Sequence, residues 1–415
     1  MQQRNTFNIA IVGHVANGKT TITHCLSGIN TKRHAEEQKS GRTIKLGYAN
    51  LTLFKCNDCN TKYSTSQDVK KHSCGECGED CKKAYFVSLC DTPGHSSFVK
   101  TMVRGSATVD GAIILTCPKD FKSQVQTLQH LAILEILNVR NVFIIQNKCD
   151  LVTKDECLTN YGLIREEFKG TVAETCPIIP CCAQRGLGVE KIIDCLFDMC
   201  DKLTVSASST QPPKFNVFQI IRSFDINRPD TDIDHLRGGV IGGTLNGGEL
   251  HVGDDIEIRP GLITKDNKYR ALKTKILSIY SESTPIKQCS TGGLVALGTR
   301  LDPTLTRGDR MVGQVCGKFG SDIPPVVTTN VIKVFYMVPS SSSSSKKNRL
   351  TENIFYYFLW ANVNVKGKVH QHSPSLPDSK HVFKITYEQP ICICAHRCII
   401  YDVSNTLIGF GQLIE

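Results

Sequence analysis

A glycine-rich segment near the start of the chain has the residue types and spacing of a phosphate-binding loop. Within Ile9–Thr21 (IAIVGHVANGKTT), Gly13 and Gly18 enclose four residues and are followed by Lys19 and Thr20. Glycine lets successive backbone N–H groups turn toward one phosphate, a lysine adds charge at the β- and γ-phosphates, and a threonine hydroxyl can ligate Mg²⁺. The alternative is a glycine turn that only joins a strand to a helix. The complete spacing after an apolar strand favours nucleotide binding.

The loop should lead into a helix over Thr21–Leu26, whose N-terminal dipole would face the same phosphates. Besides the helix dipole, the residues of the loop itself would contact the nucleotide. The predicted contacts are Ala16, Asn17, Gly18, Lys19, Thr20 and Thr21.

A second motif follows the apolar segment Tyr85–Cys90, which is predicted as a buried strand. Asp91 at the end of this strand can hold Mg²⁺ through water, and the N–H of Gly94 can reach a γ-phosphate. His95 comes directly after this Asp-x-x-Gly loop, where the attacking water should lie. A satisfied polar histidine is the alternative, but this position favours a residue that orients water. The predicted catalytic residues are His95, Lys19 and Asp91.

The polar segment 27–47 is predicted as a mobile loop before a strand over Tyr48–Phe54. Thr43 stands just before that strand. A loop threonine here can complete the Mg²⁺ shell when a γ-phosphate is present, and a solvated threonine is the alternative. The predicted Mg²⁺ residues are Thr20, Thr43 and Asp91.

The apolar strand Val142–Gln146 ends in an Asn-Lys-x-Asp motif that predicts the base specificity. A carboxylate accepts hydrogen bonds from both the ring N–H and the exocyclic amine of guanine, whereas adenine offers no matching pair of donors. After the strand Ile178–Pro180, a further loop can donate a backbone N–H to the guanine carbonyl oxygen. The predicted guanine contacts are Asn147, Lys148, Asp150, Cys182, Ala183 and Gln184. Together, the four loops identify a GTPase.

Two Cys-x-x-Cys pairs, separated by fourteen residues, lie between the strand Tyr48–Phe54 and the strand Tyr85–Cys90. Two such pairs can present four thiolates to one tetrahedral ion. Four unligated surface thiols are the alternative, but this polar segment has few apolar residues to hold it folded. We therefore predict a structural zinc site formed by Cys56, Cys59, Cys74 and Cys77, with His72 and Cys81 as spare candidates.

Length and composition limit the remaining possibilities. A chain of 415 residues should form two or three domains. Its 49 Lys and Arg against 39 Asp and Glu give a net charge of +10, which fits a polyanionic partner. The polar start of the chain argues against a signal peptide. No apolar run reaches the ~18 residues that a membrane span needs, so we expect no such span. Twenty cysteines then indicate reduced thiols or metal ligands in the cytosol.

Alternating strand and helix patterns predict an α/β GTP-binding domain over 1–203, with a doubly wound, mostly parallel sheet and a zinc-binding insertion at about 55–82. The Ser/Pro-rich stretch 204–214 is predicted as a linker. Short glycine-punctuated strands predict two β-barrel domains, over 215–324 and 325–415. The run Ser340–Ser345 is predicted as a disordered loop.

These motifs together carry a specific resemblance. GHVANGKTT, SGINTKRH, RTIKLGYAN, the four-cysteine insertion before DTPGH, NKCD, and GGVIGGTL with VGDDIEIRPG resemble the gamma subunit of eukaryotic and archaeal translation initiation factor 2. The resemblance implies a GTPase of the elongation-factor-Tu type that carries methionylated initiator tRNA to the small ribosomal subunit in the GTP state and releases it after hydrolysis. It also implies alpha and beta subunits, a GTPase-activating protein and a nucleotide-exchange factor. Tyr48 of LGYAN would hold the methionylated acceptor end, with packing on the sheet as the alternative.

The chain departs from this pattern at three site residues. Ala16 has no carboxylate for the second Mg²⁺ that some archaeal members bind, and Asn17 replaces the usual His or Asp, so we expect one Mg²⁺. Cys182 stands where Ser is common, a mild change because the base contact comes from the backbone. No arginine can be placed over the γ-phosphate, which predicts slow hydrolysis without an activating protein.

Three alternative functions remain at this stage. They are a selenocysteine-specific elongation factor, a metabolic GTPase of the kind that drives sulfate activation, and a scaffold that does not hydrolyse GTP. The zinc insertion and LGYAN favour the initiation factor over the metabolic enzyme. The intact Lys19, Thr20, Asp91 and Asp150 count against the scaffold.

Overall fold

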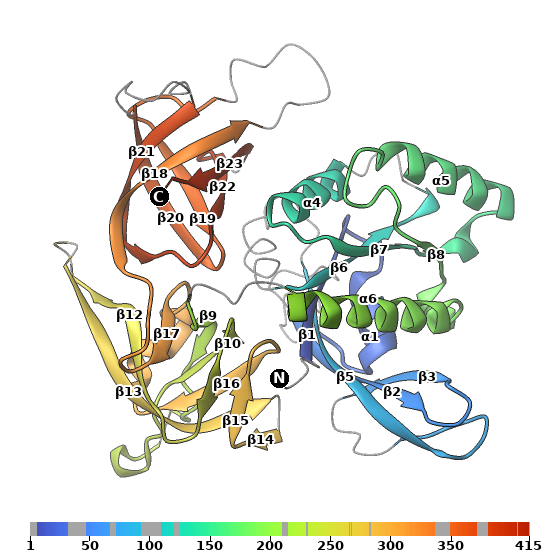
Figure 1. The fold of residues 1–415 in the computed structure, drawn as a ribbon, viewed down its shortest axis with the longest axis horizontal. Helices are drawn as coiled ribbons and strands as arrows, with labels where there is room; N and C mark the ends of the chain where they lie inside the picture. Colours follow the sequence, from blue (N-terminus) through green and yellow to red (C-terminus); the bar gives the residue numbers. More distant parts are fainter. Residues whose placement is uncertain are drawn as a thin grey trace. The chain divides into compact units, whose positions relative to one another are not determined.

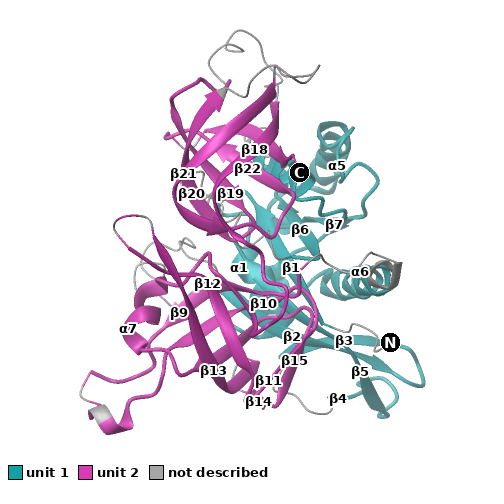
Figure 2. Ribbon diagram, turned by 60° about the vertical axis from the view of Figure 1, so that its left-hand side comes forward, with its two compact units in different colours: residues 1–211 teal, residues 212–415 magenta. Residues whose placement is uncertain are grey.

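The structure is a computed structural model, and it divides the chain into two compact units, Met1–Gln211 and Pro212–Glu415 (Figure 2). The boundary falls inside the predicted linker 204–214. The residues that the structure describes are 6–31, 47–66, 72–92, 109–119, 125–209, 215–229, 231–264, 266, 268–281, 284–336, 349–371, 381–404 and 406–414.

The first unit is built on a sheet of eight strands within its described residues, in the order β3-β2-β5-β1-β6-β7-β8 with β4 beside β5 (Figure 1). The pairs β1–β5, β1–β6, β6–β7 and β7–β8 are parallel, whereas β2, β3 and β4 pair antiparallel. This confirms the predicted, mostly parallel sheet. The strands are β1 (Thr6–Gly13), β2 (Gly47–Cys56), β3 (Lys62–Ser66), β4 (His72–Ser73), β5 (Asp80–Asp91), β6 (Gly111–Thr116), β7 (Asn141–Gln146) and β8 (Ile178–Pro180).

Helices cover both faces of this sheet. Helices α1 (Lys19–Ser27) and α6 (Val189–Ser209) pack on one face, and α4 (Val125–Ile136) and α5 (Lys154–Glu167) lie on the other (Figure 1). Because both faces are covered, β1, β6 and β7 read as nearly continuous apolar runs. The core under α1 and α6 includes Ile9, Ile11, Ile22, Leu26, Leu89, Ile113, Phe143, Ile192 and Leu196.

Helix α6 continues to Ser209, so it includes the first residues of the stretch that the Ser/Pro-rich composition predicts as a linker. Leu203 and Thr204 remain buried on its inner side, and the Thr204 hydroxyl donates to the Cys200 carbonyl at 2.8 Å. This hydrogen bond gives the buried Thr204 hydroxyl a partner within the helix, although composition alone assigns this residue to a loop.

The second unit contains two closed β-barrels. The first runs β12-β17-β9-β10-β16-β13 and closes through the β12–β13 pairing, with β14 added beside β13 and a separate β11–β15 pair. Its elements are β9 (Phe218–Phe224), β10 (Val240–Leu245), β11 (Glu249–His251), β12 (Asp255–Ile263), β13 (Tyr269–Ser281), β14 (Thr284–Ile286), β15 (Gln288–Ser290), β16 (Val295–Thr299), α7 (Pro303–Thr306) and β17 (Val315–Lys318).

The second barrel closes in the order β18-β21-β20-β19-β22-β23. Its strands are β18 (Val326–Tyr336), β19 (Phe355–Trp360), β20 (Val363–Gln371), β21 (Val382–Cys392), β22 (Arg397–Tyr401) and β23 (Leu407–Leu413). The two barrels therefore confirm the predicted fold class, while the predicted division at 324/325 stays a prediction.

The two barrels share buried contacts. The side-chain amide of Asn362 donates to the Ile220 carbonyl at 2.9 Å, and a small apolar cluster joins strands from both barrels. This cluster consists of Val217, Val315, Ile323 and Cys392.

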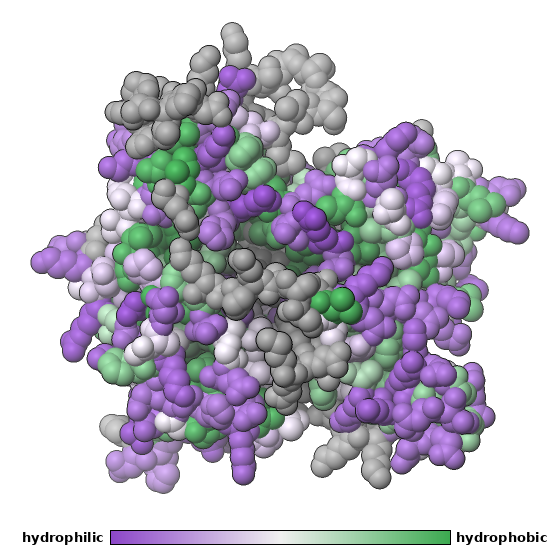
Figure 3. All heavy atoms as spheres, viewed as in Figure 1, coloured by the Kyte–Doolittle hydropathy of each residue, from purple (hydrophilic) through white to green (hydrophobic). Residues whose placement is uncertain are grey.

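Among the described residues, no helix combines the length and the apolar character that a membrane crossing requires. Hydrophilic residues dominate much of the face drawn in Figure 3, and the hydrophobic areas between them are smaller.

Candidate functional site

The phosphate-binding loop connects β1 to α1, and close contacts with β6 and with the Asn147 loop explain its two glycines. A Cβ at Gly13 would lie 2.4 Å from the Leu115 carbonyl oxygen, and a Cβ at Gly18 would lie 2.4 Å from the side-chain nitrogen of Asn147. Both glycines also have positive φ angles, 143° and 91°. Any larger residue would therefore both strain the backbone and push β6 or the Asn147 loop away.

The Lys19 ammonium is buried within its own loop, where it donates to the carbonyl oxygens of Gly13 at 2.9 Å and His14 at 2.8 Å. Burial lowers the pKa of Lys19 to about 8, although the Asp91 carboxylate opposes this shift. A bound phosphate would supply further negative charge next to this ammonium, which favours its charged form.

Asp91 ends β5 as predicted and lies beside Thr20. Its Oδ2 atom accepts hydrogen bonds from the hydroxyls of Thr20 at 2.7 Å and Thr31 at 2.8 Å, and its side chain is fully buried. The structure thus brings two of the three predicted Mg²⁺ residues together. A buried carboxylate beside a threonine hydroxyl is an oxygen-rich donor set that suits a hard cation. Thr31 lies in the SGINTKRH stretch that carries part of the resemblance, but no chemical role was predicted for it.

His130 is a second residue that the sequence analysis missed. It lies in α4, and its Nδ1 atom accepts a hydrogen bond from the Gly13 N–H at 3.2 Å. Burial, together with the charge of Lys19, lowers the pKa of His130 to about 3, so the ring stays neutral and Nδ1 stays an acceptor. Its one sequence signal was a polar residue within an apolar helical pattern.

The predicted base-binding loops are connected by Asn147. Its amide donates to the Asn17 carbonyl at 2.8 Å, and its Oδ1 atom accepts from the Ala183 N–H at 3.1 Å. Asn17 in turn donates to the Leu115 carbonyl at 2.8 Å. The side chains of Asn147 and Asn17 therefore hold the phosphate loop, the Asn-Lys-x-Asp motif and the Cys-Ala-Gln loop in one network.

Asp150 lies at the partly open edge of this network. A hydrogen bond from the Cys182 thiol is the largest influence that lowers its pKa, and Arg185 lies 3.7 Å from its Oδ2 atom. The carboxylate therefore stays ionised and can accept from a base. Cys182 was predicted to act through its backbone alone, and the structure adds this contact of its thiol. Lys148 takes a left-handed conformation between Asn147 and Asp150, and Gln184 is exposed.

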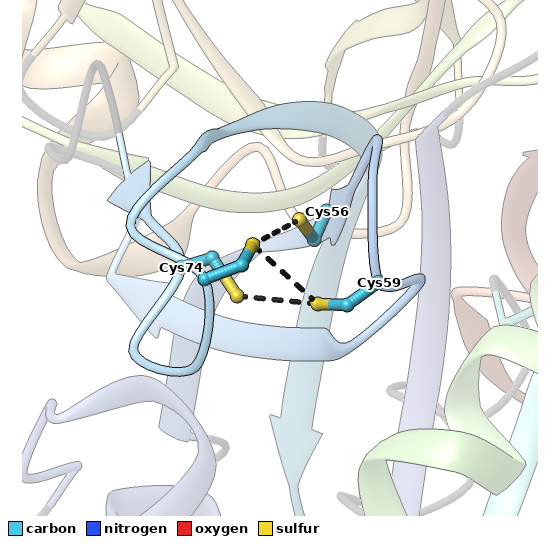
Figure 4. A group of neighbouring side chains, drawn as sticks. Cys56, Cys59 and Cys74 are labelled. Carbon is cyan, nitrogen blue, oxygen red and sulfur yellow. Dashed lines mark hydrogen bonds between the residues drawn. The ribbon is translucent and has the colours of Figure 1, made fainter.

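The four predicted cysteines of the insertion form one cluster (Figure 4). Their sulfur atoms lie within 4.8 Å of one another, with 3.4 Å between Cys56 and Cys77 and between Cys59 and Cys74. Four ligands at ~2.3 Å from a tetrahedral zinc ion would lie ~3.8 Å apart, so these positions fit such an ion. His72 packs against Tyr63 with 4.5 Å between the ring centroids, and neither His72 nor Cys81 belongs to the cluster.

Comparison with known proteins decides the family. Residues 4–202 match the family described as the elongation factor Tu GTP binding domain. The chain is 42% identical to translation initiation factor 2 subunit gamma of Methanosarcina mazei over 317 residues, which cover 76% of this chain and 72% of that protein. The corresponding subunit of Pyrococcus furiosus is 41% identical over 324 residues, with coverages of 77% and 76%.

The chain belongs to the gamma-subunit family of translation initiation factor 2. With its elongation-factor-Tu-type domain, it is a translational GTPase of initiation that hydrolyses GTP.

Solved structures of other translation factors share the fold of this gamma subunit. A bacterial selenocysteine-specific elongation factor, EF-Sec, aligns with a TM-score of 0.72 at 19% identity, covering 99% of this chain and 58% of that one. The elongation factor SelB of Methanococcus maripaludis, in complex with the GTP analogue GppNHp, aligns with a TM-score of 0.70 at 18% identity. That alignment covers 100% of this chain and 80% of SelB. At these identities the likeness shows the fold alone.

Of the predicted residues Thr43, Tyr48, Gly94 and His95, the structure describes only Tyr48. Thr43, Gly94 and His95 lie outside the residues that the structure describes, and their roles stay predictions. Tyr48 lies in β2, is partly buried, and pairs with Cys90 on the neighbouring strand β5. This contact fits the alternative in which the ring packs on the sheet.

Proposed function

We propose that this gamma subunit binds methionylated initiator tRNA in its GTP state, delivers it to the small ribosomal subunit and releases it after GTP hydrolysis. The observation that carries the proposal is the 42% identity to an initiation factor 2 gamma subunit over 76% of the chain. That alignment is supported by the network that joins the phosphate and base loops around Asn147.

We assign GTP binding to the loops built around Lys19 and Asp150. The phosphates would take the place of the two carbonyl oxygens as partners of the Lys19 ammonium, and the helix dipole of α1 would add to this attraction. Asp150 would accept the two guanine donors. Mg²⁺ would be held by Thr20 and Asp91, with the predicted Thr43, and would neutralise charge on the phosphates.

For hydrolysis, we assign His95 to the orientation of the attacking water and Lys19 to the charge on the γ-phosphate. Asp91 would hold the metal-bound water in place. An arginine over the γ-phosphate is typically worth roughly 10³–10⁵ in rate, and none is assigned here, so an activating protein would be required. A nucleotide-exchange factor would restore the GTP state.

Zinc is the cofactor assigned to Cys56, Cys59, Cys74 and Cys77, with a structural role because four thiolates complete a tetrahedral shell. The partners of the assembly would be the alpha and beta subunits and the small ribosomal subunit, and the site of action would be the cytoplasm. Tyr48 remains a proposed contact of the methionylated end, with packing on the sheet beside Cys90 as the alternative.

A filter-binding titration tests the carrier function. Methionylated initiator tRNA, its uncharged form and an elongator tRNA are each titrated with a GTP analogue and with GDP. We expect tight binding for the methionylated initiator tRNA with the GTP analogue, and weaker, more salt-sensitive binding in the other five combinations. Equal binding in all six would refute the proposal and leave a GTPase with another cargo.

A further inference from the structure

Thr31 lies where three segments of the first unit meet. Its hydroxyl donates to Oδ2 of Asp91 at 2.8 Å, the same atom that accepts from Thr20, and Thr31 is 8% exposed. Asp91 is 60 residues further along the chain, so this contact is tertiary rather than local.

The fold itself brings Thr31 to this position. Helix α1 ends at Ser27 and is capped by Gly28, whose left-handed conformation (φ 70°) lets its N–H donate to the His24 carbonyl and turns the chain. Gly47 pairs with Asp91 at one end of the β2–β5 strand pair. A Cβ at Gly47 would lie 2.6 Å from the Cβ of Thr31, so glycine leaves the space that the Thr31 side chain occupies.

We propose that Thr31 is a positioning residue of the Mg²⁺ site, which fixes the Asp91 carboxylate for the ion that Thr20 and Asp91 would hold. The inference rests on the Mg²⁺ site assigned under the proposed function.

The hydrogen bonds explain this role. Thr20 can donate its proton to Asp91 while its oxygen still offers a lone pair to a cation, so the Thr20–Asp91 bond is compatible with a bound metal. The second donor, Thr31, restricts the rotation of the same buried carboxylate. A carboxylate that is already oriented loses less conformational freedom when the ion binds.

The test measures how Mg²⁺ slows the dissociation of a fluorescent GDP derivative from the full chain. Thr31→Val keeps the shape of the side chain but removes the donor, and we expect the Mg²⁺ concentration for half-maximal slowing to rise about three- to tenfold. Thr31→Ser keeps a hydroxyl and should stay within about twofold of the original chain. Thr204→Val removes a buried hydroxyl of α6 and serves as the matched control, with no change expected.

Gly47→Ala gives a second, independent perturbation, because its Cβ must displace Thr31. We expect it to raise the Mg²⁺ requirement in the original chain but to add little in the Thr31→Val background. Such non-additivity is the signature of two residues that act through one contact. Melting temperatures measured without Mg²⁺ show whether each variant is folded.

The outcomes separate this inference from the proposed function. If the original chain shows no Mg²⁺ dependence, the assigned Mg²⁺ site is wrong. If the original chain depends on Mg²⁺ but Thr31→Val does not differ from it, or binds Mg²⁺ more tightly, then Thr31 does not position Asp91. An equal loss in Thr31→Val and Thr31→Ser would also overturn the inference, because the hydroxyl would then not be the cause.

Discussion

Residue types reveal a binding site when the chemistry itself requires them. Lys19, Asp91 and Asp150 could be found from sequence, because phosphate, cation and guanine each demand a particular group at a strand end. Thr31 and His130 could not be found in this way. They act on Asp91 and Gly13 through contacts that span 60 and 117 residues of the chain, and no short spacing encodes such contacts.

Guanine selectivity should depend on the Asp150 carboxylate. In Asp150→Asn, the amide can donate to the extra carbonyl of xanthine but can no longer accept both guanine donors. We expect GTP binding to weaken by roughly 10²-fold or more and xanthosine triphosphate to become the better ligand. Competition titrations with both nucleotides measure this, and Asp155→Asn, an exposed change in α5, serves as the matched control. ATP binding by the original chain as strong as GTP binding would contradict the assignment.

His130 should make stability depend on pH. Because its folded pKa of about 3 lies below the ordinary value near 6.5, the unfolded chain binds a proton that the folded chain excludes. The stability from the neutral ring is complete above pH 6.5 and is lost as pH falls toward 3, by up to ~1.4 kcal/mol per pH unit.

The variant His130→Asn isolates this contribution, because an amide oxygen can accept near the Nδ1 position but does not titrate. We expect its melting temperature to fall less between pH 7 and pH 5 than that of the original chain. Thermal unfolding at both pH values checks the prediction. Equal falls in the two proteins would show that His130 is not the responsible group.

At the level of elements, periodicity located the buried strands but not their full length. The sequence predicts strands over Tyr48–Phe54 and Tyr85–Cys90, whereas β2 extends to Cys56 and β5 begins at Asp80. Most of the added residues are charged, but they pair across the two strands, as Lys55 does with Lys82. Backbone hydrogen bonds to a neighbouring strand, which hydrophobic patterns cannot report, thus carry the sheet into the insertion.

The cysteine cluster should act as a local structural support for this insertion. Freshly prepared, reduced protein should contain close to one zinc ion per chain, and Cys59→Ser should lose most of it, because a hydroxyl is a poor zinc ligand. We expect faster proteolysis within residues 55–82 but GTP affinity within about twofold. Metal analysis and limited proteolysis provide the measurements, and Cys195→Ser is the matched thiol control. Absence of zinc from the original chain would contradict the site.

The whole molecule combines a nucleotide-binding unit with two barrels that have cores of their own. Composition and turn patterns were sufficient to predict the barrels, because each closes from short strands between regular turns. One side chain that links the two barrels was not predictable. Asn362 is 2% exposed, and its contact with Ile220 connects segments 142 residues apart.

Separate cores lead to a calorimetric prediction for the full chain. We expect two unfolding transitions, of which GDP with Mg²⁺ raises only the one that belongs to the nucleotide-binding unit, since a ligand stabilises the folded form that binds it. Asn362→Ala should lower the other transition, because it removes a buried hydrogen bond to the Ile220 carbonyl, which keeps only its bond from the Gly313 N–H, at a cost of about 0.5–1.5 kcal/mol. Gln412→Ala, an exposed change on β23, is the control and should leave both transitions in place. A shift of both transitions by GDP, or a loss of GDP affinity in Asn362→Ala, would show that the two units unfold together.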